Sequence, residues 1–427
     1  MPASTTPDRA YVWIWLPGAT DPVVAGVVRQ NGDLLVYNYA ASYLARSDAI
    51  SLYAPELPLQ RGFLRPLDGL AVAGCIRDAA PDAWGQRVIL ARHAGRGTLT
   101  ADTGDLPLLT YLLESGSDRF GAVDFQTSPT AYIPRITTAS LATMQAATED
   151  FLAGEPLPVD LEDALLRGTS IGGARPKVLL RETSPGQLPR ELIAKLSVAS
   201  DPWPVVKAEA VAMDLARRVG LRVTATELIE SLGRDVLLVE RFDRPGTTGS
   251  LPGAVGQRTP VVSALTILGL DEMHGRYATY HGLADIIRAR FTDPAATLRE
   301  LFGRIVFNIA VSNTDDHARN HAAFWDGAML SLTPAYDLSP QMRSGDSAQQ
   351  AMEIARDGRR MSRMALCVEA SEVFLLSHEE ARTIISEQVD VIESQWLDAA
   401  DAARLTRADR DLLWRTLILN PAIDYEL

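Results

Sequence analysis

The segment Asn313-Thr-Asp-Asp-His-Ala-Arg-Asn320 directly follows a strongly apolar stretch, 294–311, that the sequence predicts to be a helix. Asp293 provides an N-cap, and large apolar side chains then recur at helical spacing on one face. A helix with such a face would be buried and would hold the polar segment in place. Asp315 and Asn320 are five positions apart, the spacing by which phosphoryl-transfer enzymes place a catalytic carboxylate and a Mg²⁺-binding amide.

A second carboxylate, Asp337, lies seventeen residues after Asn320 and behind a short predicted strand, 329–332. Mg²⁺ prefers oxygen ligands, so Asn320 and Asp337 are candidate ligands of one metal site. The simpler interpretation is that Asp and Asn act here as turn formers and helix caps, as they do in many polar loops.

The same segment also allows a zinc interpretation. His317 and His321 are four residues apart, as in zinc-binding helices, but Ala318 stands where the zincin signature requires Glu. A metal hydrolase using Asp315, His317 and His321 is therefore kept as an alternative, which zinc bound to the purified protein would favour.

A segment of small residues, Thr169-Ser-Ile-Gly-Gly-Ala-Arg-Pro-Lys177, leads into a predicted strand, 177–181. Glycines let backbone N–H groups approach an anion, so this segment is a candidate phosphate-binding loop. It contains neither GxxxxGK[ST] nor GxGxxG, and by itself a plain tight turn is the simpler interpretation.

Lys195 and Glu209 favour the phosphate-binding interpretation. Lys195 lies among apolar residues of a predicted strand, 191–198, and Glu209 lies on the apolar stripe of a predicted helix, 205–219. A lone buried charge is costly, so each side chain needs a partner or must extend to water. A strand lysine followed by a helix glutamate is the ion pair that orients nucleotide phosphates in protein kinases.

The segment Glu240-Arg-Phe-Asp-Arg244 ends a further predicted strand, 235–242, and precedes a Gly- and Pro-rich stretch, 245–262. A hinge between two lobes would offer backbone groups and an apolar ring to a nucleotide base at this point. A strand end with solvated charges is the alternative.

Composition excludes several classes of protein. The 427 residues include 41 basic and 54 acidic side chains, a net charge of −13, which opposes non-specific binding to nucleic acid or to an anionic membrane. Two cysteines, Cys75 and Cys367, exclude a disulfide framework. The sequence has no apolar run long enough to span a membrane and no secretory signal, so we expect a cytoplasmic protein.

The N-terminal part predicts three strands, 11–16, 23–30 and 34–39, and then a helix from about Asp82. Residues 126–138 are rich in Thr, Ser and Pro and predict a linker. The strands and helices above are followed by a hinge and a mostly helical block, and this order predicts a two-lobed arrangement.

Taken together, the motifs resemble the HipA family, serine/threonine kinases that are the toxins of bacterial toxin–antitoxin pairs. Five segments carry the resemblance: 170–177, 193–195, 239–244, 313–320 and 336–337. The stretch Asp78-Ala-Ala-Pro-Asp-Ala-Trp-Gly85 is similar to the family's N-terminal subdomain. The resemblance implies an α+β, two-lobed protein-kinase-like fold of three segments: a β-rich N-terminal subdomain (1–135), a nucleotide-binding lobe core with the phosphate loop (136–243) and a helical C-lobe with the catalytic loop (244–427).

The resemblance also implies a role for individual residues. Asp315 would be the catalytic base, and Asn320 and Asp337 would bind Mg²⁺. Lys195, supported by Glu209, would contact the α- and β-phosphates of ATP. The remaining ATP-binding residues would be the phosphate loop Gly172, Gly173, Ala174, Arg175, Pro176 and Lys177, the adenine hinge Glu240, Arg241 and Phe242, and the pocket residues His317 and Tyr336. Ser170 matches the autophosphorylated serine of the family, and a dianion there would compete with ATP phosphates.

One departure from the family pattern concerns the catalytic base. Asp316 stands where glycine is usual, which leaves the choice between Asp315 and Asp316 open, although the spacing to Asn320 favours Asp315. The resemblance further implies a HipB-like helix-turn-helix antitoxin as partner, contact with DNA only through that antitoxin, no membrane partner, and a translation-related substrate such as an aminoacyl-tRNA synthetase. The alternative is a nucleotide-binding corepressor that needs no turnover.

Overall fold

The computed structural model describes residues 7–94, 103–136, 139–168, 175–183, 189–245, 256–343 and 347–424. The chain divides into two compact units, each described here by itself. The first unit comprises Met1–Val198, Glu230–Val262 and Trp325–Ala328, and the second comprises Ala199–Ile229, Ser263–Phe324 and Met329–Leu427. The three segments expected from the sequence, 1–135, 136–243 and 244–427, stay a prediction.

The first unit begins with an antiparallel sheet of order β3-β2-β1-β4. Its strands are β1 (Arg9–Ile14), β2 (Val23–Asn31), β3 (Leu34–Tyr39) and β4 (Val123–Gln126). The three strands expected at the N-terminus are confirmed, and Gly32 at a φ of 63° makes the turn between β2 and β3. Strand β4 was not predicted from the sequence, because it is short and pairs with β1 from more than a hundred residues away.

The helices of this unit are α1 (Ala41–Leu44), α2 (Gly74–Arg77), α3 (Ala83–Ala94), α4 (Leu108–Glu114), α5 (Leu141–Ala153) and α6 (Val159–Arg167), with a 3₁₀ turn, η1 (Thr103–Asp105). The helix expected from Asp82 is α3, and Asp82 Oδ1 accepts the N–H of Gly85 (2.7 Å) as its N-terminal cap. Trp84, which has no exposed surface, packs edge-on against Phe151 of α5. These contacts fix the start of α3.

A second four-stranded sheet has the order β5-β6-β8-β7. Its strands are β5 (Lys177–Glu182), β6 (Arg190–Leu196), β7 (Thr226–Ser231) and β8 (Arg234–Glu240). The three strands expected here, 177–181, 191–198 and 235–242, are confirmed as β5, β6 and β8, with bounds shifted by one or two residues. In β7 the chain returns from the second unit to the first. The antiparallel register places Lys177 directly opposite Lys195.

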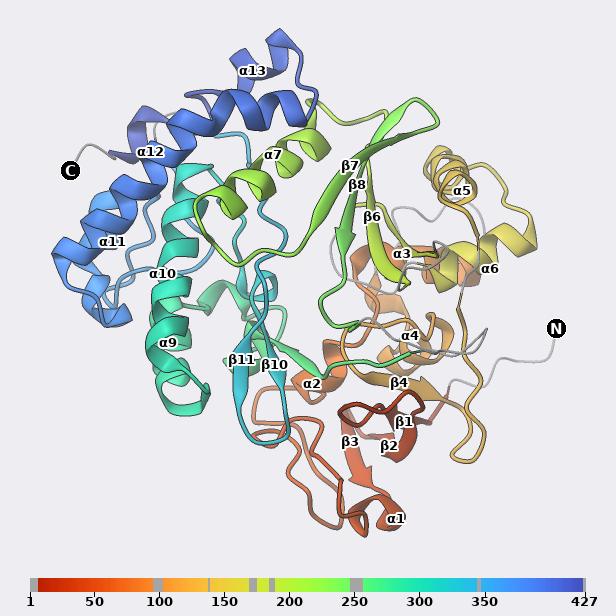
Figure 1. The fold of residues 1–427 in the computed structure, drawn as a ribbon. Coiled ribbons are helices and arrows are strands. Elements are labelled where there is room, and N and C mark those ends of the chain that lie inside the picture. Colours follow the sequence, from red (N-terminus) through yellow and green to blue (C-terminus); the bar gives the residue numbers. More distant parts are fainter. Residues whose placement is uncertain are drawn as a thin grey trace. The chain divides into compact units, whose positions relative to one another are not determined.

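The second unit is mostly helical (Figure 1). Its helices are α7 (Val205–Arg218), α8 (Ala264–Ile267), α9 (Tyr280–Arg290), α10 (Pro294–Ala310), α11 (Met364–Glu369), α12 (His378–Ala402) and α13 (Arg407–Leu413), with 3₁₀ turns η2 (Gly275–Tyr277), η3 (Ala318–Asn320), η4 (Ser371–Phe374) and η5 (Pro421–Ile423). A short sheet has the order β11-β10-β9, formed by β9 (Val261–Ser263), β10 (Ala322–Trp325) and β11 (Leu330–Leu332).

Helix α10 forms the centre of this unit and contacts α9, α11 and α12. Asp293 caps it by accepting the N–H of Ala296 (3.1 Å), and every residue from Leu301 to Ala310 is buried. The helix expected from its apolar stripe is thus confirmed. None of the helices in the described ranges combines the length and the apolar character that crossing a membrane requires.

Candidate functional site

The polar segment after α10 is anchored at its start. Ser312, at a φ of 54°, donates from Oγ to the backbone carbonyl of Leu417 (2.6 Å). The N–H of Asn313 donates to the backbone carbonyl of Asn308 (2.8 Å), and its Nδ2 donates to Oδ1 of the same residue (2.9 Å). Because these groups are buried, the hydrogen bonds fix the backbone that leads to the two following aspartates.

The structure distinguishes Asp315 from Asp316, the two aspartates that the sequence leaves as candidates for the catalytic base. Asp316 is 1% exposed, and its Oδ2 accepts a hydrogen bond from the hydroxyl of Tyr280 on α9 and lies 2.8 Å from Nε2 of His321. Asp315 is exposed. A substrate can therefore reach the Asp315 carboxylate, whereas Asp316 is enclosed by side chains that hold the loop.

The surroundings of Asp315 disfavour its negative charge. Partial burial raises the pKa of Asp315, the imidazole of His317 acts against that rise, and the carboxylates of Asp337 and Asp316 add to it. A carboxylate with a raised pKa is a better proton acceptor than an ordinary surface aspartate. The repulsion between Asp315 and Asp337 is also the kind that a bound divalent cation relieves.

Asn320 and Asp337 provide the donor types that a Mg²⁺ ion prefers. Asn320, only 8% exposed, donates from Nδ2 to the backbone carbonyl of Asp315 (3.2 Å), which leaves its Oδ1 as the atom suited to bind a cation. Asp337 sits at a φ of 59°, in the left-handed region that non-glycine residues rarely adopt. Strained backbone of this kind is frequent at functional sites. An amide and a carboxylate oxygen therefore fit a hard cation that also binds phosphates.

The zinc interpretation gains no support. In the part of the chain that the structure describes, no three His, Cys, Asp or Glu side chains are grouped so that they could hold a metal ion. His321 contacts Asp316, so it is not directed with Asp315 and His317 at one ion. Nδ1 of His317 is buried and has no hydrogen-bond partner among the described residues, which suits a role in lining a ligand pocket.

Tyr336 connects the Asp337 segment to the segment Asn313–Asn320. Its hydroxyl donates to the backbone carbonyl of Arg319 (2.7 Å), one residue before Asn320. This hydrogen bond joins the segment of Asp337 to the backbone next to Asn320. It therefore restrains the two predicted Mg²⁺ ligands relative to each other. The predicted contact of Tyr336 with a nucleotide stays a prediction.

The middle of the expected phosphate loop, including Ser170, Gly172, Gly173 and Ala174, lies outside the described residues. Arg175 is half-buried, and Pro176 and Lys177 are buried.

Nζ of Lys177 lies 3.1 Å from Oδ2 of Asp82, and each side chain is 5% exposed. Burial raises the pKa of Asp82 to about 6, although Lys177 acts to lower it. The sequence analysis did not identify this partner, which precedes Lys177 by 95 residues.

Lys195 and Glu209 lie in different units of the chain. Lys195 is half-buried on β6, and Glu209, 5% exposed, is on the buried side of α7, as its place on the apolar stripe predicts. The ion pair between them stays a prediction.

The predicted adenine hinge, Glu240 to Phe242, begins at the last residue of β8. The N–H of Arg241 donates to the backbone carbonyl of Glu191 (2.9 Å), and its guanidinium contacts Asp118 (2.6 Å). These contacts engage both the N–H and the side chain of Arg241 inside the protein. Phe242 is half-buried, and the adenine contact of this segment stays a prediction.

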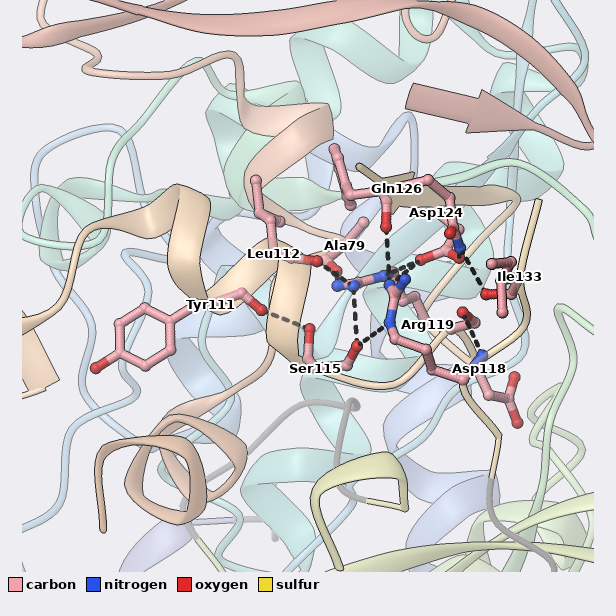
Figure 2. Close-up of polar contacts among 12 residues, drawn as sticks. Ala79, Tyr111, Leu112, Ser115, Asp118, Arg119, Asp124, Gln126 and Ile133 are labelled. Atoms are coloured by element: carbon pink, nitrogen blue, oxygen red, sulfur yellow. Dashed lines mark hydrogen bonds and ion pairs between the residues drawn. The ribbon is translucent and has the colours of Figure 1, made fainter. Parts of the chain in front are cut away.

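Arg241 belongs to a buried group of charges that the sequence analysis missed. Asp243 pairs with Arg241 (2.9 Å) and with Arg244 (2.8 Å), and Asp118 contacts the same two arginines. Nearby, Arg119 Nε lies 2.7 Å from Asp124, and neither side chain is exposed; Figure 2 shows how backbone carbonyls complete the partners of Arg119. The group joins the end of β8 to residues 118–124 of the same unit.

Comparison with known families decides the classification of the chain. The model of the HipA-like C-terminal domain matches residues 169–396, more than half of the sequence. The chain belongs to this family. The matched range begins at the predicted phosphate loop of this HipA-like protein and includes the whole segment from Asn313 to Asp337.

Two curated relatives match shorter parts. Y4mE of Sinorhizobium fredii is 29% identical over 154 residues, which is 35% of this chain and 36% of that protein. A serine/threonine-protein kinase toxin, HipA of Shewanella oneidensis, is 26% identical over 161 residues, which is 34% of this chain and 36% of that protein. The chain thus covers about a third of the length of each of these relatives.

Among solved structures, the HipA chain of a Shewanella oneidensis complex of HipA, HipB and operator DNA superposes with a TM-score of 0.65. The match is 17% identical and covers 98% of this chain and 100% of that chain. The expected two-lobed, kinase-like α+β fold of the HipA type is thus confirmed.

Proposed function

We propose that this HipA-like protein is an ATP- and Mg²⁺-dependent protein kinase that transfers the γ-phosphoryl group to a serine or threonine hydroxyl. The observation that carries the proposal is the arrangement after α10. An exposed carboxylate with a raised pKa, Asp315, is followed five residues later by Asn320, and Asp316 is held inside by Tyr280 and His321.

In the proposed reaction, the substrate hydroxyl oxygen bonds to the γ-phosphorus while the bond to the β,γ-bridging oxygen breaks and ADP leaves. Asp315 accepts the proton that the hydroxyl loses. Asn320 and Asp337 hold Mg²⁺, which, when bound, neutralises charge on the β- and γ-phosphates. The buried Asp316 keeps the loop backbone in place, so that Asp315 stays close to the bound hydroxyl.

The nucleotide contacts complete the proposal. Lys195 contacts the α- and β-phosphates and is oriented by Glu209, as in protein kinases generally. The loop from Gly172 to Lys177 surrounds the phosphates, and Glu240 to Phe242 receives the adenine. A double-mutant cycle between Lys195 and Glu209 on ATP affinity tests the pairing, because independent residues give additive effects.

We further propose that the kinase is the toxin of a toxin–antitoxin pair and phosphorylates a translation-related protein. Support comes from the curated relative named as a HipA toxin kinase and from the structural match, which is taken from a complex with HipB and operator DNA. The partner of this chain would be a HipB-like antitoxin, and DNA would be contacted through it.

The test is mass spectrometry of the protein after incubation with ATP and Mg²⁺. We expect a phosphate on Ser170 in the unaltered protein and none in Asp315→Asn, because loss of a general base slows proton transfer by about 10²–10⁴-fold. Asp390→Asn, an exposed aspartate on α12, is the matched control and should keep the phosphate.

If the unaltered protein neither gains a phosphate nor binds ATP, the proposal that it is a kinase is wrong. The corepressor alternative is tested with the same variant. A toxin kinase loses toxicity and phosphate transfer in Asp315→Asn, whereas a corepressor keeps its full effect in the DNA complex with the antitoxin.

A further inference from the structure

Arg258, which precedes β9, is a buried cation with no part in the function proposed above. It is 1% exposed, and its guanidinium carbon lies 3.6 Å from the centre of the Trp15 ring. At this separation the guanidinium lies flat on the ring, because an edge-on group would push its nitrogens into the ring. One face of Arg258 is therefore covered by Trp15, and its N–H bonds point sideways, within the guanidinium plane.

One edge of the Arg258 guanidinium is not used by the protein. Nη1 donates to the backbone carbonyl of Ser117 (2.9 Å). Nε and Nη2 are also buried, but neither has a hydrogen-bond partner in the part of the chain that the structure describes. These two atoms form the edge with which an arginine binds two oxygens of a carboxylate or phosphate at once. The unused edge is thus the one best suited to an oxyanion.

The aspartates near Arg258 are bound to other arginines. Burial lowers the pKa of Arg258 to about 10, and the nearby Arg244 acts in the same direction. Asp118 and Asp124 act against this shift of the pKa, but each already contacts two other side chains. These are Arg241 and Arg244 for Asp118 (2.6 and 2.9 Å), and Arg119 and Arg135 for Asp124 (2.7 and 3.1 Å; Figure 2). Among the described residues, no carboxylate forms an ion pair with Arg258.

The charges around Arg258 do not balance. The arginines of the group are Arg119, Arg135, Arg241, Arg244 and Arg258, and its aspartates are Asp118, Asp124 and Asp243. Glu191, which also acts on Asp118, contacts an arginine of its own, Arg181 (3.2 Å), and leaves the excess of positive charge unchanged. Such an excess is costly in a protein interior unless an anion compensates it. Arg258 is where we expect that anion.

Tyr132 provides a further donor beside Arg258. Its ring packs edge-on against Trp15, with ring centres 5.5 Å apart. Its hydroxyl is buried, and although Ser117 and Asp124 lie near, it forms no hydrogen bond of normal geometry with the described residues. A buried hydroxyl without a partner is costly. An oxyanion at the unused edge of Arg258 would accept a hydrogen bond from this hydroxyl as well.

We propose that Arg258 and Tyr132 form a binding site for one small oxyanion, a carboxylate or inorganic phosphate. Nε and Nη2 of Arg258 bind two of its oxygens, and the hydroxyl of Tyr132 donates to it. The bound anion connects three parts of the first unit that are distant in sequence: Trp15 at the end of β1, residues 117–132, and the segment before β9. The site does not depend on the proposed ATP binding.

The test is equilibrium dialysis of the full chain against inorganic phosphate and, separately, acetate. Chloride keeps the ionic strength constant, and Mg²⁺ and nucleotide are left out. We expect saturable binding of phosphate, acetate or both, and the ion that binds more tightly shows whether the site takes a phosphate or a carboxylate. Arg258→Lys keeps the charge but lacks the two-donor edge, so it should bind the ion about tenfold more weakly or worse.

Tyr132→Phe removes only a hydroxyl that forms no hydrogen bond with the described residues, so it should fold. We expect it to bind the same ion about fivefold more weakly. Arg9→Lys is the matched control, because Arg9 on β1 forms an exposed ion pair with Asp8 (3.0 Å). This control should bind the ion as the unaltered protein does.

Two results would overturn the inference. One is that the unaltered protein binds neither phosphate nor acetate, since water alone would then satisfy the unused edge. The other is equal affinity in the unaltered protein, Arg258→Lys and Tyr132→Phe, because the ion would then bind elsewhere, for example at the proposed nucleotide site. If Arg258→Lys does not fold, Tyr132→Phe decides alone.

Discussion

Two short segments rich in charge, 240–244 and 313–320, use aspartate in opposite ways. In the first, Asp243 is 2% exposed and lies between two arginines at hydrogen-bonding distance. In the second, Asp315 is exposed, and the negative charges of Asp337 and Asp316 act against its own. The first arrangement stabilises an anion, and the second destabilises one.

The pKa values of the two aspartates follow the same division. Burial acts to raise the pKa of Asp243, but Arg241 and Arg244 outweigh it and hold the pKa below its usual value. The pKa of Asp315 is raised. A carboxylate that gives up its proton easily is suited to a permanent ion pair, whereas one that takes a proton more readily is suited to chemistry.

The largest expected effect is on stability, from Asp243→Ala. Removing this carboxylate leaves Arg241 and Arg244 buried with fewer partners and removes the acceptor for the N–H of Gly121 (2.8 Å). We expect the free energy of unfolding to fall by about 3–5 kcal/mol, measured by urea denaturation. Asp315→Ala should change it by about 0.5 kcal/mol or less.

Asp357→Ala, which breaks the exposed ion pair with Arg359, is the surface control and should also have a small effect. If Asp243→Ala and Asp315→Ala lowered the free energy of unfolding equally, the two segments would not differ in how they use aspartate.

The second prediction concerns Asp316, which lies in the proposed catalytic segment, 313–320, but resembles Asp243 in its burial. Tyr280→Phe removes one hydrogen bond to Asp316 and should lower the free energy of unfolding by about 1–3 kcal/mol. Because the loop then holds Asp315 less firmly, kcat for phosphoryl transfer should fall several-fold while ATP affinity stays unchanged. Steady-state kinetics and urea denaturation measure the two effects.

Tyr277→Phe is the control for this substitution, since Tyr277 is 57% exposed. A stability loss in Tyr280→Phe without any change in kcat would show that Asp316 holds the fold and not the catalytic loop.

The third prediction is a pH dependence of stability. Burial acts to raise the pKa of Asp118, Asp124 and Asp243, but their arginine partners outweigh it and lower all three below the ordinary value of 3.8. Below that value the unfolded chain binds protons that the folded protein does not, so stability present at neutral pH is lost as the pH falls. Each such carboxylate contributes about 1.4 kcal/mol per pH unit over the interval between its two pKa values.

Urea denaturation at about pH 7, 5, 4 and 3 measures this loss, because this series extends from neutral pH to below the ordinary carboxylate pKa of about 4. Asp243→Asn should show a shallower decline than the unaltered protein, and Asp390→Asn, which replaces an exposed aspartate on α12, should not. Equal slopes in the two variants would contradict the assignment of the acid sensitivity to the buried group.

Much of the architecture was predictable because its signals are local. The N-cap at Asp293 and the apolar stripe behind it predicted α10 to within one residue. The spacing from Asp315 to Asn320 marked the segment after α10 as a candidate catalytic segment, and that role stays a prediction. Short runs of apolar residues predicted β5 and β6. In each case the residues that determine the structure lie within a few positions of one another.

The partners of the buried charges were not predictable in this way. Arg241 contacts Asp118 across 123 positions, and Asp316 contacts Tyr280 across 36. Nothing within either segment indicates which distant residue will face it once the chain folds. The sequence could therefore place Asp316 beside Asp315 but could not show that one is enclosed and the other exposed.

The hydrogen bond from Ser312 to Leu417 has a consequence for synthesis of the chain. The two residues are 105 positions apart, so the anchor of the catalytic segment is translated long after the segment itself. Domains acquire structure as they emerge from the ribosome, N-terminal parts first. A nascent chain that has not yet reached residue 417 would carry every proposed catalytic side chain and still lack this hydrogen bond, so the proposed activity would require residue 417 to be translated first.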